Sequence, residues 1–584
     1  MADRVSDDPS DPGRVWHDAD VSAEPSSRIS TFAPLRVRSY RLLWSAVLVS
    51  NFGTFLQLVA APWLMLELTG SPLMVSLVTA SLALPRLLLT LPAGTLADAI
   101  DRRILLMIGQ WGSALAVAVL AVLTWQDNVT PGTLLVLSFA LGVGSAVSVP
   151  AYQTLVPDLV DRELVPAAVS LNSAAFNVAR AIGPAIGGAF VAAGAADLAF
   201  GLNAVSYIVV ALTLLAVPAV GSADTTKSTV WRSTRAGLRY VRFTGPMLLT
   251  IGVAAAFALT AASIQTLLPN VVADDLGMDA SGFGLLLGSF GAGALVAALT
   301  TERLRTYVRH LLPLSIIGFG VSGVVFGLSR IPLLSAVALA AAGLFWVWTL
   351  TMMNATVQLM SPRWVRGRAI SIYLLAVLGV QPFGAVASGA IAEQIGSATT
   401  VAAMTSLTLL LGVLALRMSL PVLGDVVAPS MPEDWVTPEH VSAVSGSPVL
   451  VQTTWCIDLL EAERFFDAMR DVRRHRLRTG AERWSLFRDA DHPDRVTEVF
   501  QVHNWEDHLA QHQRMDHEAA EALSLARSFD RRGGPVTRHL VGLDLLDPDA
   551  PPIADMLLAQ HSQMHDIDGS VPLADDEIVS ERPG

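Results

Sequence analysis

Twelve apolar stretches, each close to the length that crosses a membrane, follow one another along most of the chain. A helix needs about 20 apolar residues to span the ~30 Å hydrocarbon core of a bilayer. The predicted spans cover residues 42–66, 73–97, 104–125, 131–155, 166–192, 198–219, 247–272, 282–300, 311–329, 332–360, 365–391 and 397–420. The pattern therefore predicts an all-α polytopic membrane protein with twelve transmembrane helices.

The twelve stretches fall into two groups of six. A polar stretch at residues 221–245 separates the groups and is interpreted as a cytoplasmic central loop. A shift of 201 residues aligns Arg102 with Arg303, which is a sparse sign of an internal repeat. Two parallel halves are a known transporter architecture, whereas a twelve-helix bundle without repeats is the alternative. The predicted halves are residues 42–220 and 246–420.

Charged residues divide the predicted loops into two sides. The basic side carries Arg36, Arg38, Arg41, Arg102, Arg103, Arg162, Lys227, Arg232, Arg235, Arg239, Arg242, Arg303, Arg305, Arg309, Arg363, Arg366 and Arg368. The opposite side carries Arg330 as its only base, with Glu67, Asp127, Asp197, Asp274, Asp275, Asp279 and Glu393. Basic loops stay in the cytoplasm. We therefore expect a multi-pass protein of the cytoplasmic (inner) membrane with both termini cytoplasmic.

The composition supports this membrane body and adds a soluble part to it. Charged residues make up 15% of the chain and apolar residues 52%, whereas an ordinary globular domain carries about 25% charged residues. The single cysteine, Cys456, excludes a disulfide scaffold. The net charge of −12 is uneven, because the part from Asp425 onward holds 15 Arg against 30 Asp and Glu. An acidic chain disfavours nucleic acid as a partner.

Three polar segments flank the predicted domains. Residues 1–41 lack the charged, apolar and cleavage regions of a signal peptide. Their polar composition predicts a disordered cytoplasmic lead. Residues 421–447 contain Pro and Ser and are interpreted as a linker. Residues 546–584 are acidic and contain Pro, which predicts a flexible tail.

Between the linker and the tail, residues 448–545 alternate between strand-like and helical patterns. Val449 to Trp455 alternates like a strand, and Asp458 is a suitable N-cap for a following helix. The remaining predicted elements are strands at residues 484–487, 496–502 and 536–543, and a helix at 506–529. The order βαββαβ predicts an α+β ferredoxin-like domain.

The loop after the second span carries a recognisable motif. Gly94-Thr-Leu-Ala-Asp98-Ala-Ile-Asp101-Arg102-Arg103 resembles the signature that the major facilitator superfamily has between its second and third spans. Gly94 permits a tight turn at a span end, and Asp98 is placed to pair with Arg102 or Arg103. We interpret this gating loop as a cytoplasmic latch that breaks when the halves rock. A simple topology anchor is the alternative, but it leaves Asp98 and Gly94 unexplained.

The fifth span carries a second motif of the same superfamily. Gly183-Pro184-Ala-Ile-Gly187-Gly188 is similar to the G-P-x-x-G-G signature of its antiporters. Small residues let membrane helices approach closely, and proline kinks a span or frees a carbonyl. Tight helix packing and a specific role in antiport both remain open for these residues.

A narrower resemblance points to one branch of the superfamily. The segments Leu68-Thr-Gly-Ser-Pro72, Asn177-Val-Ala-Arg180 and Arg366-Gly-Arg368-Ala resemble the transmembrane secretion effector branch, which includes enterobactin-exporter-like proteins. The resemblance covers about residues 35 to 421. It implies secondary active transport, usually export by proton antiport. No carboxylate lies at mid-membrane depth, so the coupling is implied by the resemblance alone, with Glu67 and Asp98 as edge candidates.

Two arginines lie inside predicted spans. Arg180 shares a helical face with Asn177, and Arg86 follows a proline in the second span. A charge at bilayer depth costs at least about 2.5–3.5 kcal/mol, so it faces a partner, a water-filled cavity or a substrate. We hypothesise that Arg180 lines the substrate cavity and favours anionic or electron-rich substrates; pairing of either arginine with backbone carbonyls is the alternative. Neutral candidates for the same cavity, each also suited to an interhelical hydrogen bond, are Asn51, Gln57, Gln265, Asn354, Gln358 and Gln381.

The soluble domain resembles the antibiotic-biosynthesis-monooxygenase-like family of dimeric α/β barrels, on a weaker motif than the transporter. A cofactor-free oxygenase that modifies the transported substrate is therefore the alternative function. His508 and His512 have a spacing that suits zinc, but no carboxylate ligand is specified, which favours a solvated or subunit-contact face. Trp484 and Trp505 fit either a small-molecule pocket or core packing. We expect a regulatory or dimerising domain without enzyme activity, metal or cofactor, and partners limited to a small-molecule substrate, protons, the lipid bilayer and a second copy.

Overall fold

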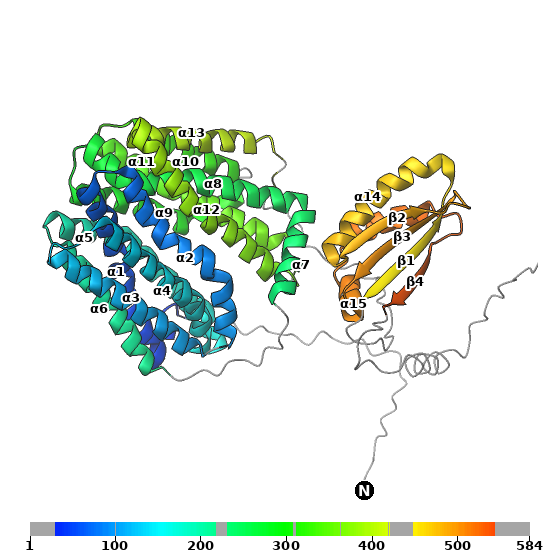
Figure 1. Ribbon diagram of the computed structural model, residues 1–584, viewed down its shortest axis with the longest axis horizontal. Coiled ribbons are helices and arrows are strands. Elements are labelled where there is room, and N and C mark those ends of the chain that lie inside the picture. The colour runs from blue at the N-terminus through cyan, green and yellow to red at the C-terminus, as the bar shows by residue number, and fades with distance from the viewer. Residues whose placement is uncertain are drawn as a thin grey trace, which may run out of the picture.

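The computed structural model describes residues 30–99, 101–217, 230–307, 311–362, 364–418, 420 and 448–542. Most of the predicted lead, the predicted linker and the predicted tail lie outside the described residues. The described part forms a helical membrane body and a smaller domain that contains a β-sheet (Figure 1).

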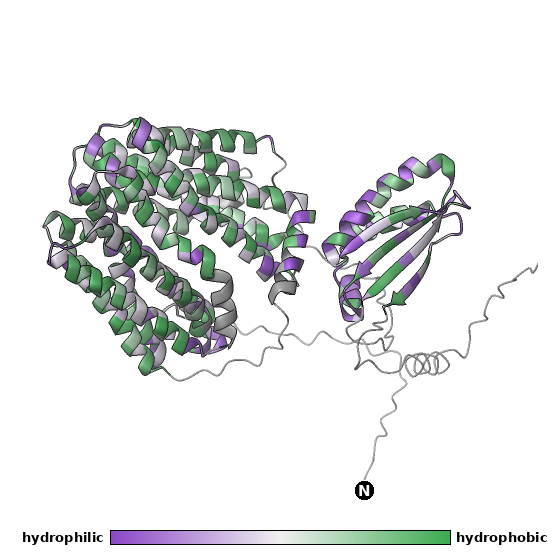
Figure 2. Cartoon of the chain, viewed as in Figure 1, coloured by the Kyte–Doolittle hydropathy of each residue, from purple (hydrophilic) through white to green (hydrophobic). Residues whose placement is uncertain are grey.

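All twelve predicted spans are helices, which confirms the all-α membrane fold. Each is long and apolar enough to cross a membrane. The first six are α1 (Arg38–Thr69), α2 (Pro72–Ala99), α3 (Arg102–Trp125), α4 (Pro131–Asp158), α5 (Val165–Ala192) and α6 (Ala196–Leu215). The second six are α8 (Gly245–Asn270), α9 (Ala280–Tyr307), α10 (Leu311–Leu328), α11 (Pro332–Leu359), α12 (Arg366–Ile395) and α13 (Ser397–Ala415). Apolar residues dominate these helices in the view of Figure 2, as expected where lipid covers the outer surface.

Local sequence signals set several helix ends. α1 ends at Gly70, whose φ of 64° is the left-handed conformation that glycine adopts without strain. Thr130 and Thr133 form a capping box at the start of α4. A single π-helical turn, Val271–Asp275, extends α8. Most spans therefore begin and end close to the residues that the hydropathy pattern indicated.

The central segment contains a helix that the sequence analysis did not anticipate. α7 (Val230–Phe243) lies within the stretch interpreted as a loop and ends just before α8 begins. Its arginines made the stretch look polar, but Gly237, Tyr240 and Val241 are buried on one face. The spacing of these three positions is that of one helical face. α7 therefore packs against the membrane body as an amphipathic helix.

Two helix pairs join the halves of the membrane body. α5 packs against α9, and α2 packs against α12. Inside the second half, Phe257, Phe319 and Trp346 form an aromatic cluster with ring centroids 5.1–5.8 Å apart. Phe290 of α9 extends this cluster, with its ring centroid 6.4 Å from that of Trp346.

The soluble domain has the predicted strand order. Its elements are β1 (Val449–Cys456), α14 (Ala462–Thr479), β2 (Arg483–Arg488), β3 (Arg495–Val502), α15 (Trp505–Gln513), α16 (His517–Ser528) and β4 (Val536–Val541). The sheet order is β2-β3-β1-β4, and all neighbouring strands are antiparallel. This is the ferredoxin-like arrangement. Alternate residues of β1 are buried, so the helices cover one face of the sheet.

Helix caps in this domain confirm the predicted role of Asp458 and correct the helix predicted over residues 506–529. Asp458 acts as an N-cap, because its side chain accepts a hydrogen bond of 2.9 Å from the Leu460 amide in the turn that leads into α14. The single helix predicted over residues 506–529 is wrong, because α15 and α16 are separate. Asp516 caps α16 by accepting from the Ala519 amide at 3.0 Å, and an N-cap starts a new helix.

Candidate transport site and interdomain contacts

The two predicted membrane arginines lie in different surroundings. Arg86 on α2 donates a hydrogen bond of 3.1 Å from Nη2 to the Ser145 hydroxyl on α4. Arg180 on α5 places its guanidinium 5.5 Å from the ring centroid of Phe290 on α9. Because α5 belongs to the first half and α9 to the second, Arg180 contacts both sides of the junction between the halves.

The backbone at this junction is packed unusually tightly. A Cβ added at Gly291 would collide with the carbonyl oxygen of Arg180, and one added at Gly284 would collide with the carbonyl oxygen of Pro184. A Cβ added at Gly188 would lie 2.5 Å from the carbonyl oxygen of Ala280. Only glycine permits such an approach. The positions of α5 and α9, and with them that of Arg180, are therefore set by direct backbone contact.

The motif in the fifth span contributes to this packing. A Cβ at Gly183 would lie 2.6 Å from Cβ of Phe55, and one at Gly187 would lie 3.0 Å from Cα of Leu56. Gly183 and Gly187 thus allow α5 to pack closely against α1. Pro184 and Gly188 pack against α9. This arrangement supports the packing interpretation of the motif.

The predicted neutral cavity residues are distributed over several surroundings. Gln57 is buried between α1 and α6, where its Oε1 accepts a hydrogen bond of 3.4 Å from Asn203. Asn177 donates to the carbonyl of Ser173 within its own helix at 2.9 Å. Both contacts favour a packing role over a cavity role. Gln358 donates a hydrogen bond of 3.0 Å to Asn354 in the same helix. The remaining three candidates, Asn51, Gln265 and Gln381, are partly exposed.

The structure resolves part of the gating loop. The Asp101 carboxylate caps α3 by accepting from the Arg103 amide at 2.8 Å. Arg102 forms an ion pair of 2.6 Å with Asp158 at the end of α4. Arg103 donates to the carbonyl of Leu215 at 2.9 Å.

The tight turn expected at Gly94 is wrong, because α2 continues as a helix to Ala99. Gly94 lies within α2, and the Asp98 side chain is outside the described side chains. A latch through Asp98 therefore remains a prediction. The sequence analysis missed Asp158, whose position at the end of a span gave no pairing signal.

Contacts between the halves also occur at the end of the bundle opposite the basic loops. Glu393 of α12 accepts a hydrogen bond from the Ser71 hydroxyl and another, of 3.3 Å, from the Leu73 amide at the start of α2. Trp63 of α1 stacks on Phe283 of α9, with centroids 5.9 Å apart and planes 18° apart. A carboxylate at a helix N-terminus is favourable. Glu393 therefore caps a helix of the other half.

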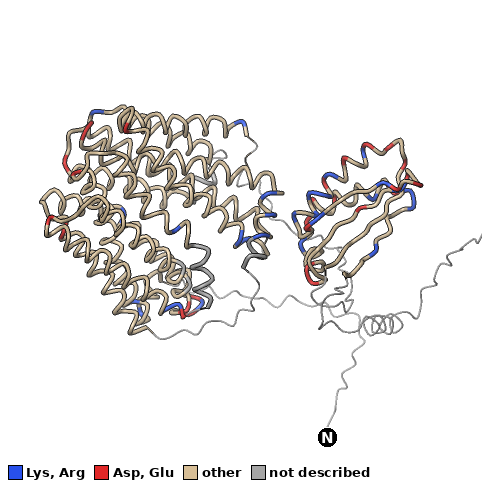
Figure 3. The backbone as a smooth tube through the Cα atoms, in the orientation of Figure 1, with Lys and Arg blue, Asp and Glu red and all other residues tan. Residues whose placement is uncertain are grey.

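The soluble domain contacts the membrane body through α7 and the turn that precedes α12. Nη1 of Arg239 donates to the carbonyl of Ala481 at 3.2 Å. The guanidinium of Arg514 lies 4.5 Å from the ring centroid of Trp364, and Phe243 packs against the apolar core of the domain. These residues define what we call the seam. Figure 3 shows basic segments of α7 and α12 facing the charged end of α14 across it.

The interior of the soluble domain holds an ion pair and a histidine cluster. Glu498 is fully buried and accepts from Arg476 at 3.2 Å and from the Trp484 indole at 2.9 Å. His508 is buried, with its ring centroid 4.7 Å from that of His512 and 4.8 Å from that of His539. Burial, followed by the neighbouring His512 and His539, lowers the pKa of His508 to about 3.

This burial corrects one expectation for the histidines. The solvated or subunit-contact face expected at His508 is wrong, because that side chain packs against Trp505 inside the domain. Among the described residues, no group of three or more His, Cys, Asp or Glu is arranged to hold a metal ion. Both Trp484 and Trp505 contribute to the core, as the packing interpretation predicted.

Comparison with known proteins shows which families and transporters this chain resembles. A family model described as "Transmembrane secretion effector" matches residues 29–544, which include the soluble domain. The chain is 29% identical over 388 residues to the multidrug efflux pump Tap of Mycolicibacterium fortuitum, covering 64% of this chain and 94% of that protein. It is 25% identical over 369 residues to the staphyloferrin A transporter of Staphylococcus aureus, covering 62% and 92%. The solved nucleoside transporter NupG shares the fold, with a TM-score of 0.57 at 12% identity over 65% of this chain and all of that one.

Proposed function

This chain belongs to the transmembrane secretion effector family of major facilitator transporters, and we propose that it exports small molecules of the drug, siderophore or secondary-metabolite kind. The similarity to a multidrug efflux pump and to a staphyloferrin A transporter supports export. The observation that carries the proposal is Arg180, a cation at the junction of the two halves with an aromatic ring as its contact. An anionic or electron-rich substrate is the class that such a site attracts.

Alternating access fits the way the halves meet. Backbone contacts along Gly284 and Gly291 hold α5 and α9 together near Arg180. Glu393 and Trp63 join the halves at the end opposite the basic loops. Release of these contacts would open that end while the other end closes. We assign the basic end to the cytoplasm, following the positive-inside rule.

Proton antiport is part of the proposal and rests on the family resemblance. Of the two edge candidates, Glu67 accepts a hydrogen bond of 2.7 Å from the Trp63 indole, so its carboxylate is tied to a residue that contacts the second half. Protonation of Glu67 would weaken this bond, because an ionised acceptor bonds more strongly than a neutral one. Asp98 remains the candidate at the other end.

We propose that the soluble domain regulates the transporter or joins two copies of it. Its contact with α7, which connects the two halves, supports a regulatory role. One face of its sheet, which includes the exposed Phe487, is not covered by its helices, and this face suits a homodimer. The fused oxygenase remains a separate hypothesis, tested by oxygen uptake of the full chain with phenolic compounds.

Export is tested by comparing small molecules in cells and spent medium with the gene deleted and restored. An exporter predicts a compound that accumulates in deleted cells and is depleted from their medium. Restoration with Gly284→Val should fail, because the added side chain collides with the α5 backbone. Gly201→Val should succeed at equal membrane level, since a Cβ added there would meet no atom of another helix within 4 Å. Unchanged pools in both compartments would count against export of an endogenous compound.

A further inference from the structure

Two arginines of the seam, Arg239 and Arg514, have two further arginines nearby, Arg235 and Arg368, and we count all four as seam arginines. Arg235 and Arg239 lie on α7, Arg368 lies in the first turn of α12, and Arg514 follows α15. Burial lowers the pKa of Arg514, and the repulsion of Arg368 and Arg239 lowers it further. Arg235 likewise lowers the pKa of Arg239, after burial and against the attraction of Glu482. Each of these four cations is therefore repelled by at least one of the others, and Asp507 and Glu482 offset part of this repulsion.

Two of these cations, Arg239 and Arg514, are opposed by carboxylates only at a distance. Glu482 and Asp507 lie within electrostatic range. Across the described residues, however, neither Arg239 nor Arg514 has a carboxylate oxygen within 4.0 Å, the limit for an ion pair. Like charges that are partly withdrawn from water and lack direct counter-charges are unfavourable.

Backbone carbonyls accept hydrogen bonds from both of these arginines. Arg239 donates to Ala481 O at 3.2 Å, and Arg514 donates to Thr479 O at 3.0 Å. Both carbonyls lie at the C-terminal end of α14, where the helix dipole is negative. The Nε–H group of Arg239 is buried without a hydrogen-bond partner in the described structure. A buried donor of this kind indicates a further acceptor.

The position and the chemistry of the seam indicate that this further acceptor is a phosphate oxygen. α8, a candidate span, begins at Gly245, two residues after α7 ends, so the seam lies beside the membrane surface. Guanidinium groups bind phosphate oxygens through paired, charge-assisted hydrogen bonds. Basic residues next to a span attract anionic lipid headgroups.

We propose that the seam binds a phosphate-bearing anion that bridges the soluble domain and the membrane body. Arg239 and Arg514 supply donors from the two sides, and Arg235 and Arg368 add to the positive potential. The phosphate can belong to an anionic lipid headgroup or to a free phosphate compound. The bound anion would offset the repulsion within the seam and hold the soluble domain on α7.

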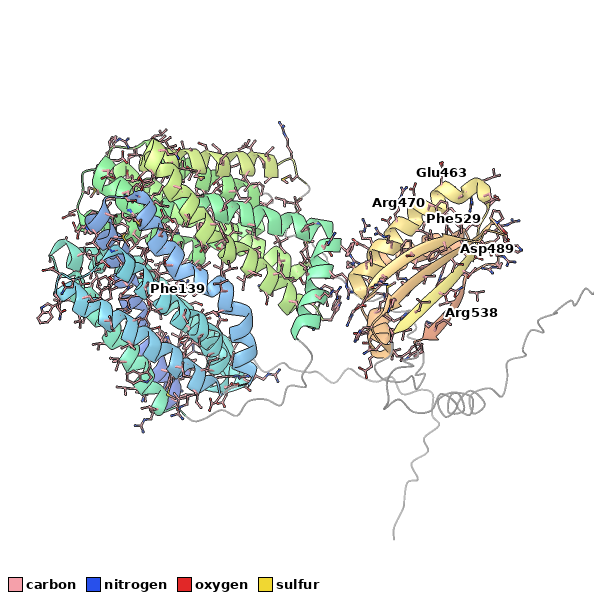
Figure 4. The ribbon with its side chains drawn as sticks, in the orientation of Figure 1. Phe139, Glu463, Arg470, Asp489, Phe529 and Arg538 are labelled. Carbon is pink, nitrogen blue, oxygen red and sulfur yellow. The ribbon has the colours of Figure 1, made fainter. Side chains whose placement is uncertain are left out.

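The test measures binding to the purified full chain in detergent by native mass spectrometry. Phosphatidylglycerol and phosphatidylcholine are titrated separately, and inorganic phosphate is added as competitor, with chloride at matched ionic strength as control. Removal of each seam arginine should weaken phosphatidylglycerol binding by about fivefold. The variants are Arg239→Gln with Arg514→Gln, and separately Arg235→Gln. The matched control is Arg538→Gln on β4, which lies on the opposite side of the domain (Figure 4).

The outcomes distinguish a lipid headgroup from a free phosphate compound, and both from the absence of a phosphate site. A preference for phosphatidylglycerol that falls in the seam variants and persists in Arg538→Gln supports a lipid headgroup. Competition by phosphate, but not by chloride, without a lipid preference supports a free phosphate compound. Equal binding by all variants overturns the proposal. Arg235 is exposed and makes no described hydrogen bond to the soluble domain, so its variant tests binding even if the double variant undocks the domain. Transport does not enter this measurement, so its outcome is independent of the export proposal.

Discussion

Arg476 in the soluble domain and Arg180 in the membrane body are withdrawn from bulk water in different ways. Arg476 forms an ion pair of 3.2 Å with the fully buried Glu498 and lies 4.5 Å from the ring centroid of Phe500. Arg180 has a comparable ring contact with Phe290 at 5.5 Å, but none of the ion pairs of the described residues includes it. In the folded soluble domain Glu498 therefore supplies a counter-charge to Arg476, whereas no described residue forms an ion pair with Arg180.

We expect this difference to distinguish a structural cation, Arg476, from a cation that acts on the substrate, Arg180. A cation–ring contact contributes about 0.5–2 kcal/mol, which is less than the roughly 2.5–3.5 kcal/mol that a charge costs at bilayer depth. We therefore expect Arg180 to retain attraction for an anion that arrives with the substrate. Arg476 has no such capacity, because Glu498 already supplies its counter-charge. Four measurements test this contrast.

The largest expected effect is loss of the soluble domain in Glu498→Ala. Removal of the carboxylate leaves Arg476 buried without its counter-charge, which costs about 3–5 kcal/mol. Hydrogen exchange of the β1 and β3 amides in the full chain measures this loss. Glu518→Ala is the control, because that carboxylate is 76% exposed and pairs with Arg478 at 3.5 Å; we expect a change below about 0.5 kcal/mol. Equal protection in both variants would show that the Arg476 pair is dispensable.

The next effect is on transport. Arg180→Ala should lower export of an anionic substrate by about tenfold or more while the membrane level is unchanged, because the attraction for the anion is lost. Arg180→Lys should retain part of the activity, since the charge remains. Arg330→Ala is the control, because this arginine pairs with Asp275 at 3.1 Å in a loop at the end of the bundle. Normal export by Arg180→Ala would make this arginine structural, like Arg476.

A third measurement uses pH to test the buried histidines of the soluble domain. The pKa of His508 is lowered to about 3, and that of His512 to about 4, chiefly by burial. An unfolded histidine has a pKa of about 6.5, so the unfolded state binds more protons below this pH. The stability is full above pH 6.5 and falls as the pH decreases. For His508 alone the loss from pH 7 to 5 is about 2 kcal/mol.

Hydrogen exchange of the sheet amides, corrected for intrinsic rates, follows this loss. His508→Leu should flatten the pH dependence, because leucine does not titrate. A variant that keeps the slope of the parent chain would show that His508 is not the titrating group. The membrane helices should keep their protection over the same pH range.

The smallest effect is expected at the end of the bundle where Glu393 caps α2. Glu393→Gln keeps the acceptor but removes its charge, and charge-assisted bonds are about twice as strong as neutral ones. Opening should therefore become a few-fold more frequent. A Ser76→Cys reporter, at a site buried between α2 and α12 next to Gly389, measures this as faster alkylation in a Cys456→Ser background. Arg330→Ala, which removes an ion pair with Asp275 inside the second half, should leave the alkylation rate at the parental value.

The sequence by itself determined the twelve spans, the order of the strands and the presence of two membrane arginines. These features are local: apolar length sets a span, alternation sets a strand, and a charge inside a span is visible as a letter. The sequence also located the glycine motif of the fifth span. It did not reveal α7, because the apolar positions of that helix are few and its arginines dominate the composition.

Only the tertiary structure decided what the polar groups contact. It placed Phe290 beside Arg180, Glu498 beside Arg476, Asp158 beside Arg102 and Asn203 beside Gln57. Each pair is separated by between 22 and 146 positions, so no spacing rule connects its members. A single charge is a property of one position, whereas its compensation depends on which helices and strands pack together.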